Sequence, residues 1–304
     1  MKNNAWKGHL GMTVANVMWG VMSPISKMIM AGGIITPLIL TNLRIFGATA
    51  LFWLASCFCK QEHVPHKDMM KLFFAALLGI VFNQGAFIFG LGLTSPINAS
   101  IITTSTPILT MVIAALYLRE PITGKKVMGI FLGATGALTL ILSSQQISNG
   151  NGSNIWGDLL CLFAEVSFSL YIVLYKGLIG RYSPVTLMKW MFTYSSICMI
   201  PFSYSQFAGV NWGGLDGQMI AGTTFVIVGA TFLGYLLIPV GQHNLRPTVV
   251  TMYCYVQPIV ASIVAVLWNM DSFSIWKVVA VILVFSGVYL VTRSKSRAQM
   301  ESQQ

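Results

Sequence analysis

The chain has 304 residues, of which 55% are hydrophobic and only 9% are charged, whereas about 25% of the residues in an ordinary soluble domain are charged. So few charged residues cannot cover a water-exposed surface, which excludes a soluble globular protein. The formal net charge of +10 comes from Lys and Arg in short connectors between apolar runs, not from the compact basic patch of a nucleic-acid-binding protein.

Long apolar stretches follow one another from the N-terminus. Each is close to or above the roughly 20 residues that a helix needs to cross about 30 Å of hydrocarbon. The first is too long for the core of a signal peptide, so we expect it to be retained. The sequence therefore predicts an all-α integral membrane protein with ten transmembrane helices, over residues 8–31, 36–58, 69–92, 95–118, 124–143, 155–176, 184–206, 217–241, 247–269 and 274–293.

The connectors between these helices alternate between basic and uncharged. Of the 18 Lys and Arg residues, 14 fall on one side of the membrane in the ten-helix arrangement. Because basic connectors stay in the cytoplasm, this predicts that both termini are cytoplasmic. The expected location is the bacterial inner (plasma) membrane.

A segment rich in Ser, Asn, Gln and Gly, residues 144–154, is predicted to link two units at 8–143 and 155–293, with a cytoplasmic tail at 294–304. A shift of 151 residues places Pro96 on Pro247, Pro107 on Pro258, Glu120 on Asp271, Lys126 on Lys277 and Gly136 on Gly287. Shifts of 149 and 147 extend the match, with Gly8 on Gly157, Lys27 on Lys176 and Pro37 on Pro184. Since each unit has five helices, equivalent helices cross in opposite directions, and such inverted repeats are typical of alternating-access transporters.

Short motifs recur in a characteristic order, namely Trp19-Gly20 with Lys27, Leu43-Arg44-Ile45-Phe46, Leu91-Gly92-Leu93, Pro107 and Glu120-Pro121. With the repeat, they resemble the EamA-type branch of the drug/metabolite transporter superfamily over about 9–142 and 155–292. The resemblance implies a central cavity formed by helices one to four and six to nine, and export of amino acids or other metabolites, commonly coupled to protons. The second unit has Phe168-Ser169 and Met191 at the Trp-Gly and Arg positions. Any function of Trp19-Gly20 or Arg44 would therefore belong to the first unit alone.

Glu165 lies about ten residues into the sixth helix, which places a carboxyl group near the middle of the bilayer. An ionised group there costs about 3 kcal/mol or more unless it is solvated or paired. Glu165 is therefore a candidate for proton binding coupled to substrate movement. The alternative is a neutral Glu that only joins two helices by a hydrogen bond.

Arg44 lies in the interior of the second helix, roughly 12 Å from its outer end at 1.5 Å per residue. Its guanidinium could attract an anionic part of a substrate or pair with a carboxylate. The alternative is a structural contact with backbone carbonyls.

Pro107 and Pro258 each remove a backbone donor from the middle of a helix, and paired broken helices are the best indication in a sequence of a binding site at the membrane midplane. Polar residues cluster around the same two prolines, and others lie in the first, third and sixth helices. The expected substrate-binding residues are Asn16, Trp19, Arg44, Asn83, Gln84, Thr103, Thr106, Pro107, Tyr171, Tyr253, Gln257 and Pro258.

Motifs for catalysis, ATP hydrolysis or metal binding are not found, so we expect no enzyme, cofactor or metal site. The sequence favours a secondary-active, alternating-access exporter of small metabolites such as amino acids or drug-like compounds, with protons as a possible coupling partner and no nucleic acid. A lipid or lipid-linked carrier flippase is the alternative, and a membrane enzyme or receptor is less favoured because of the repeat. We expect a monomer in the bilayer, with a dimer as the alternative. Gly129-x-x-x-Gly133 permits close helix contact, and we expect it to serve packing within the chain rather than a dimer face.

Overall fold

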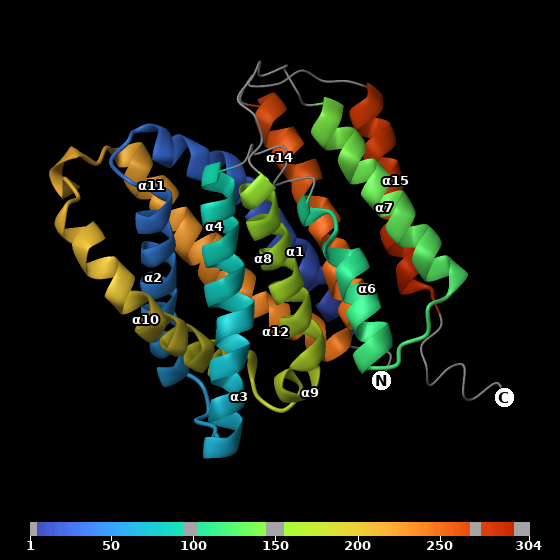
Figure 1. The fold of residues 1–304 in the computed structure, drawn as a ribbon, viewed down its shortest axis with the longest axis horizontal. Helices are drawn as coiled ribbons and strands as arrows, with labels where there is room; N and C mark the ends of the chain where they lie inside the picture. Colours follow the sequence, from blue (N-terminus) through green and yellow to red (C-terminus); the bar gives the residue numbers. More distant parts are fainter. Residues whose placement is uncertain (1–4, 94–101, 144–154, 268–274, 295–304) are drawn as a thin grey trace.

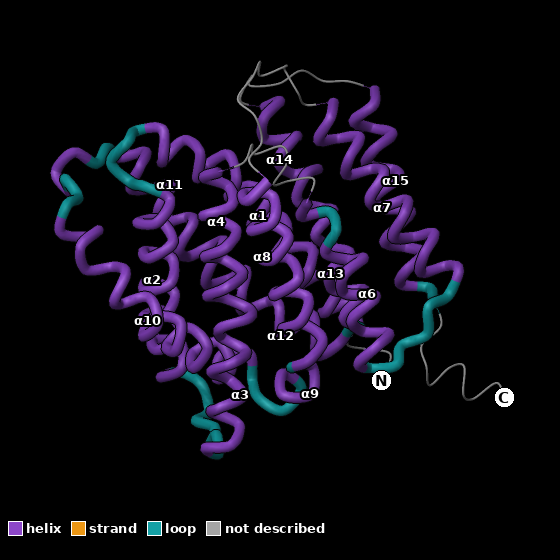
Figure 2. The backbone as a smooth tube through the Cα atoms, viewed as in Figure 1, coloured by secondary structure: helices purple, strands orange, loops and turns teal. Residues whose placement is uncertain are grey.

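The structure is a computed structural model that describes residues 5–93, 102–143, 155–267 and 275–294. Every regular element in these ranges is helical (Figure 1, Figure 2). The first half contains α1 (Ala5–Ala31), α2 (Pro37–Cys57), α3 (His66–Ala76), η1 (Leu77–Phe82), α4 (Asn83–Leu93), α6 (Thr106–Tyr117) and α7 (Gly124–Ser143). The second half contains α8 (Ile155–Leu174), α9 (Lys176–Ile179), α10 (Pro184–Ala208), η2 (Trp212–Gly214), α11 (Gly217–Phe225), η3 (Val226–Leu233), α12 (Gly234–Asn244), α13 (Pro247–Met252), η4 (Tyr253–Tyr255), α14 (Val256–Leu267) and α15 (Ile275–Thr292).

The starts of α2 and α10 show why the two halves fold alike. Each helix begins with a Pro whose missing N–H is not needed in the first turn. Thr36 caps α2 by accepting a hydrogen bond from the Ile39 amide, and Ser183 caps α10 in the same way from Thr186. The offset of 147 residues between these caps is the one that relates Pro37 to Pro184 in the sequence.

The third and eighth expected spans are each interrupted by a π-helical segment, η1 and η3, which no residue pattern predicted. The first residues of η1 and η3 are 149 positions apart and their last residues 151 positions apart, from Leu77 to Val226 and from Phe82 to Leu233. These are the offsets of the sequence repeat. Because π-helical segments are rare, two of them at equivalent positions indicate that the π segment is part of the repeated unit itself. Such segments often occur at functional sites.

The prolines at 107 and 258 follow breaks in their helices, as the sequence predicts. A turn at 104–105 precedes α6, in which Pro107 occupies the first turn. The segment η4 separates α13 from α14, and Pro258 is the third residue of α14. A helix that starts at a Pro loses no hydrogen bond there, so the break costs less than a Pro inside a continuous helix.

Packing pairs are exchanged between the halves in the way that a two-fold axis requires. The contact of α4 with α8 corresponds to that of α12 with α1, and the contact of α6 with α8 corresponds to that of α14 with α1. The α2–α10 and α7–α15 contacts each join two equivalent helices. In Figure 1, α7 and α15 lie side by side at one edge of the molecule.

Glycines let α7 and α15 approach each other closely. A Cβ at Gly129 would lie 2.6 Å from the Gly287 carbonyl oxygen, and one at Gly136 would lie 2.7 Å from the Ala280 carbonyl oxygen. A Cβ at Gly133 would lie 2.5 Å from the Tyr255 ring. The small-residue face of α7 is therefore used within the chain.

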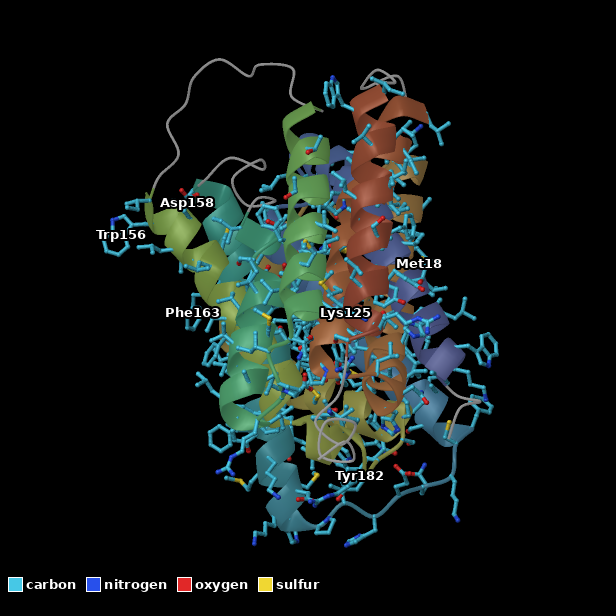
Figure 3. All side chains as sticks on the ribbon, turned by 90° about the vertical axis from the view of Figure 1, so that its right-hand side faces the viewer. Met18, Lys125, Trp156, Asp158, Phe163 and Tyr182 are labelled. Atoms are coloured by element: carbon cyan, nitrogen blue, oxygen red, sulfur yellow. The ribbon has the colours of Figure 1, made fainter. Side chains whose placement is uncertain are left out.

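The outer surface is apolar, as expected for contact with lipid. Trp156 and Phe163 of α8, labelled in Figure 3, are 68% and 49% exposed and point away from the bundle. By length and composition, four helical stretches of the described residues can cross a membrane, over Pro37–Cys57, His66–Phe87, Ile155–Leu174 and Gly217–Asn244.

Candidate functional site

Three hydrogen bonds join residues that are equivalent in the two halves. Gln84 Nε2 donates to Tyr235 Oη at 2.6 Å across 151 positions, and Tyr255 Oη donates to the Thr104 carbonyl at 3.2 Å across the same interval. The hydroxyls of Thr49 and Ser196, 147 positions apart, lie 2.7 Å from each other. Equivalent residues can touch only where the two-fold axis passes between them, so these pairs locate the axis inside the protein.

A further pair of bridges lies off the axis and is exchanged by it. Glu165 of α8 is hydrogen-bonded through Oε2 to Thr106 Oγ1 of α6 at 2.6 Å. Gln257 Nε2 of α14 donates to Asn16 Oδ1 of α1 at 2.9 Å. Offsets of 149 and 151 map Asn16 onto Glu165 and Thr106 onto Gln257. The two bridges are therefore one contact built twice, and only one copy holds a group that can bind or release a proton.

The hydrogen atoms in the Glu165 bridge can be counted. Thr106 Oγ1 lies 2.6 Å from both Glu165 Oε2 and the Thr103 carbonyl oxygen, and a hydroxyl has a single hydrogen to donate. The Thr106 hydroxyl is positioned to donate to either oxygen, and the Thr103 carbonyl can only accept. An ionised Glu165 would therefore compete with the Thr103 carbonyl for the single Thr106 hydrogen, whereas a protonated carboxyl could itself donate to Thr106. The Thr103 side chain also hydrogen-bonds this carboxyl.

Pro107 explains why the Thr103 carbonyl is available to Thr106. In a continuous helix this carbonyl would accept from the amide of residue 107, and Pro has no N–H. Thr106 is fully buried and Glu165 is 6% exposed, so water does not readily replace the missing donor. The Glu165 bridge and the backbone break are thus joined through one hydroxyl.

Arg44 and Trp19 both contact η3. Arg44 Nε donates to Thr231 Oγ1 at 2.9 Å, and Trp19 Nε1 donates to the Ala230 carbonyl at 2.8 Å. The Trp19 ring meets the Tyr235 ring edge-on at 5.7 Å. No carboxylate oxygen of the described residues lies within 4.0 Å of Arg44, so the carboxylate pairing considered above is not seen there.

Asn83 and Tyr171 lie where α4 and η1 meet α8. Asn83 Nδ2 donates to the Ala164 carbonyl at 3.0 Å, next to Glu165. Tyr171 is 1% exposed and its ring covers Gly79 of η1, where a Cβ would lie 2.8 Å away. The Tyr171 hydroxyl and Gln84 Oε1 are buried and have no hydrogen-bond partner among the described residues.

Tyr253 stands apart from the other candidates, since its hydroxyl is bonded to His9 Nδ1 at 2.6 Å. In contrast, Tyr235 and Thr231 contact several of the expected residues but were not predicted. The repeat could have identified Tyr235, because the 151-residue shift maps Gln84 onto it. Thr231 carries no comparable signal in the sequence.

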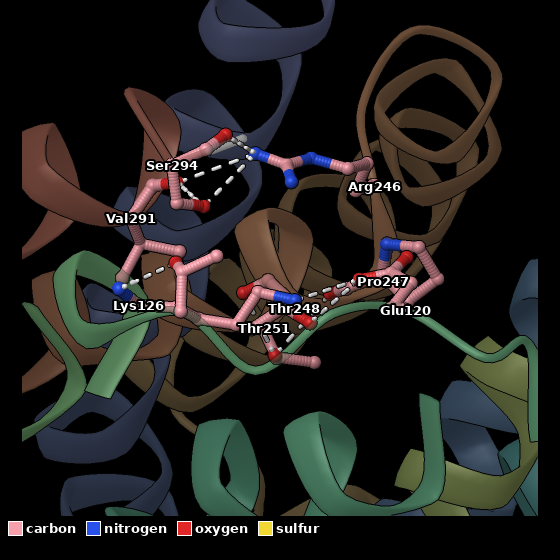
Figure 4. Close-up of polar contacts among 9 residues, drawn as sticks. Glu120, Lys126, Arg246, Pro247, Thr248, Thr251, Val291 and Ser294 are labelled. Carbon is pink, nitrogen blue, oxygen red and sulfur yellow. Dashed lines mark hydrogen bonds and ion pairs between the residues drawn. The ribbon is translucent and has the colours of Figure 1, made fainter. Parts of the chain in front are cut away.

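A buried ion pair between Lys126 and Glu120 lies among the polar contacts drawn in Figure 4. Lys126 Nζ lies 3.0 Å from Glu120 Oε2, and Thr248 donates to the same oxygen at 3.3 Å. Arg246 donates to the carbonyl and hydroxyl oxygens of Ser294 at 2.8 and 3.2 Å. These contacts tie the α6–α7 connection to α13 and α13 to the end of α15. In the part of the chain that is described, no three His, Cys, Asp or Glu side chains are grouped as metal ligands.

Comparison with known proteins gives one family. The model of the EamA-like transporter family matches residues 6–142 and again residues 155–293. An uncharacterized transporter of Archaeoglobus fulgidus is 25% identical over 86% of this chain and 90% of its own length. The uncharacterized transporter YyaM of Bacillus subtilis is 23% identical over 73% of this chain and 72% of its own. A WAT1-related protein of Arabidopsis thaliana is 27% identical over 75% of this chain and 69% of its own.

A crystal structure of another protein has the same fold, with a TM-score of 0.76, 15% identity and coverage of 98% of this chain and 99% of the other. The two family matches together span most of the sequence, and the apolar helices identify a multi-pass membrane protein. The chain is a transporter that belongs to the EamA-like transporter family.

Proposed function

We propose that this transporter is secondary-active and works by alternating access, exporting small metabolites such as amino acids or drug-like compounds across a bacterial inner membrane. Ten transmembrane helices form two inverted repeats, at 8–143 and 155–293, and both termini and the tail at 294–304 are cytoplasmic. The segment 144–154 links the repeats. The exchanged bridges at Glu165 and Asn16 carry this proposal, because a two-fold axis between five-helix units lets one conformation be converted into its inverted counterpart.

Glu165 is the proton-binding group of the proposed cycle. Loss of its proton turns the carboxyl into a pure acceptor, so the Thr106 hydroxyl has to turn from the Thr103 carbonyl to the carboxylate. The Thr103 carbonyl then loses its donor, and the break before α6 is free to rearrange. The Asn16–Gln257 copy keeps its hydrogen bond at every pH, so protonation acts on one half only.

The substrate site lies between the bridges and the axis. Asn16, Gln257, Thr106 and Glu165 hydrogen-bond one another in pairs, so a substrate that enters has to replace these bonds. Arg44 supplies a positive charge on the outer side without a carboxylate partner among the described residues. The substrate-binding role extends to Trp19, Asn83, Gln84, Thr103, Pro107, Tyr171, Tyr253 and Pro258.

Two measurements test this proposal. Infrared difference spectra of the purified protein between high and low pH should contain a carboxylic C=O band that is missing in Glu165→Gln. Metabolite profiling of the medium from expressing cells identifies exported compounds, and the most strongly exported one is then followed in proteoliposomes. Glu165→Gln should retain counterflow and lose transport driven by a pH gradient. Wild-type rates of gradient-driven transport in Glu165→Gln would rule out the proton role.

A flippase is the second candidate, favoured by an apolar cavity of about 490 Å³ between α2 and α10, lined by Phe46, Ile200, Ser203, Phe207 and Ala208. Ile200 is 56% exposed on the surface that faces lipid. A lipid carrier needs such a lateral opening. Scrambling of a fluorescent phospholipid in proteoliposomes, without export of any metabolite, would replace the exporter by this candidate.

A further inference from the structure

A second cavity, of about 420 Å³, is lined by none of the residues assigned to the substrate. It is formed by elements of both repeats, α3 and α6 on one side and α8–α9 with the following connector on the other, and is lined by Lys71, Tyr117, Leu174, Tyr175, Gly177, Leu178 and Arg181. We propose that this cavity binds the headgroup of an anionic phospholipid.

The charge of the cavity favours an anion. Asp68 lies 3.0 Å from Lys71 Nζ and 3.3 Å from Arg181 Nη1, and it also accepts a hydrogen bond from Tyr182 Oη at 2.7 Å. One carboxylate is therefore shared by two cations and a phenol, which leaves one positive charge in excess. The side chains of Lys71 and Arg181 are 45% and 60% exposed, so several of their N–H groups remain available to a ligand.

An apolar surface next to the cations distinguishes a lipid from a soluble anion. Met70 and Phe74 of α3 are 60% and 50% exposed, and Leu116 and Tyr117 of α6 are 79% and 59% exposed. Phe74 follows Lys71 by three residues, about 4.5 Å further along the helix. A phosphate bound by Lys71 and Arg181 would thus have acyl chains directly over these side chains. A free phosphate ion would gain nothing from them.

The side of the membrane also fits, given the orientation proposed above. Lys71 and Arg181 belong to the basic connectors assigned to the cytoplasm, where the leaflet is rich in anionic lipids. Basic pockets between helices on this side are known binding sites for anionic headgroups. Tyr117 and Tyr175 line the cavity and add hydroxyls that can hydrogen-bond a headgroup.

Native mass spectrometry and thermal unfolding of the protein in a neutral detergent test the site without any substrate. Phosphatidylglycerol should bind and raise the melting temperature more than phosphatidylcholine does. In Lys71→Gln/Arg181→Gln we expect about 25-fold weaker binding of phosphatidylglycerol, since each cation contributes about fivefold. The matched control Lys60→Gln/Lys125→Gln removes two exposed cytoplasmic charges outside the cavity and should bind as the wild type does.

A third variant guards against unfolding of the double variant. Asp68→Asn keeps both cations and removes the competing carboxylate, so its phosphatidylglycerol affinity should rise. Equal binding in wild type and Lys71→Gln/Arg181→Gln, or weaker binding in Asp68→Asn, would overturn the site. If soluble glycerol phosphate stabilised the protein as much as phosphatidylglycerol does at the same concentration, the ligand would be a soluble anion and the assignment to a phospholipid would be wrong. None of these results depends on transport, so the exporter proposal is judged separately.

Discussion

Gln84 and Tyr235 are equivalent residues of the two repeats, and they are hydrogen-bonded to each other at 2.6 Å. In the proposed alternating-access cycle, an exchange of conformations between the repeats maps this pair onto itself, because the axis runs between its members, so the contact can be kept in both conformations. Gln84 and Tyr235 are both buried, at 5% exposure each, and Tyr235 also touches the rings of Trp19 and Phe192. The pair therefore links the centre of the molecule to both halves.

Tyr235→Phe should destabilise the protein by about 1–2 kcal/mol. Among the described residues, it removes the only hydrogen bond of the Gln84 side chain, whose Oε1 already has no partner there. Thermal unfolding in detergent measures the loss. Tyr289→Phe, at a position that is 59% exposed, is the control and should leave the melting temperature unchanged. Equal effects of the two changes would mean that the axis bond contributes nothing.

Thr106→Val should cost about 1–3 kcal/mol, since the Thr103 carbonyl and Glu165 lose the same buried hydroxyl. Thr106→Ser keeps the hydroxyl and should recover most of the stability. Glu165→Gln should be nearly neutral at pH 7, because an amide can donate to Thr106 as a protonated carboxyl does. A large loss in Glu165→Gln would instead indicate an ionised carboxylate in the bridge.

The Asn16–Gln257 bridge is suited to a double-mutant cycle. Asn16→Ala and Gln257→Ala should show a coupling energy of about 0.6 kcal/mol, the average for hydrogen bonds between membrane helices, and at most about 1.7 kcal/mol. The coupling should not change between pH 5 and pH 8, since neither side chain titrates. A pH-dependent coupling would show that the two bridges do not act separately.

Gly129→Ala should destabilise the α7–α15 contact by about 1–3 kcal/mol. The new Cβ would lie 2.6 Å from the backbone oxygen of Gly287, which cannot move away as the end of a side chain can. Gly124→Ala, at the start of the same helix, meets nothing within 4 Å and serves as the control. Unfolding in detergent should separate the two variants by several degrees; identical melting temperatures would argue against close packing at Gly129.

Glu62, in the connector between α2 and α3, makes the stability of the folded protein depend on pH. Partial burial alone would raise the pKa of Glu62, but hydrogen bonds from the Ser183 amide and from the Thr186 and Ser183 hydroxyls, with Lys60 nearby, lower it below its ordinary value. A lowered pKa means that the contact stabilises the folded protein above the ordinary pKa of Glu and is lost as the pH falls through the lowered value. Because Glu62 is exposed, the effect should stay below about 1 kcal/mol.

The measurement is the melting temperature of wild type and Glu62→Gln from pH 7 down to pH 3.5. The difference between the two should be present at pH 7 and shrink at the acid end. A difference that grows as the pH falls would contradict the sign of the shift. Glu62 bonds Ser183 of the other repeat at 2.9 Å, so the result also reports on a contact between the repeats.

The sequence by itself determined the helical membrane class, the repeat offsets and the breaks at Pro107 and Pro258, because hydropathy and a missing N–H act locally along the chain. It also singled out Glu165, since a carboxyl group in an apolar helix is costly wherever its partner lies. The π segments η1 and η3 have no residue signature, and they emerged only with the structure.

The tertiary structure decided which polar side chains meet. Hydropathy shows that Gln84 and Asn16 lie within helices, but their partners Tyr235 and Gln257 are 151 and 241 positions away, and only the location of the axis brings them together. Tyr253, like Tyr235, is a Tyr in an apolar segment of the second half, yet its hydroxyl is hydrogen-bonded to His9. Glu165 and the Thr103 carbonyl both contact the hydroxyl of Thr106. This likewise follows only from the structure, because no spacing along the chain indicates it.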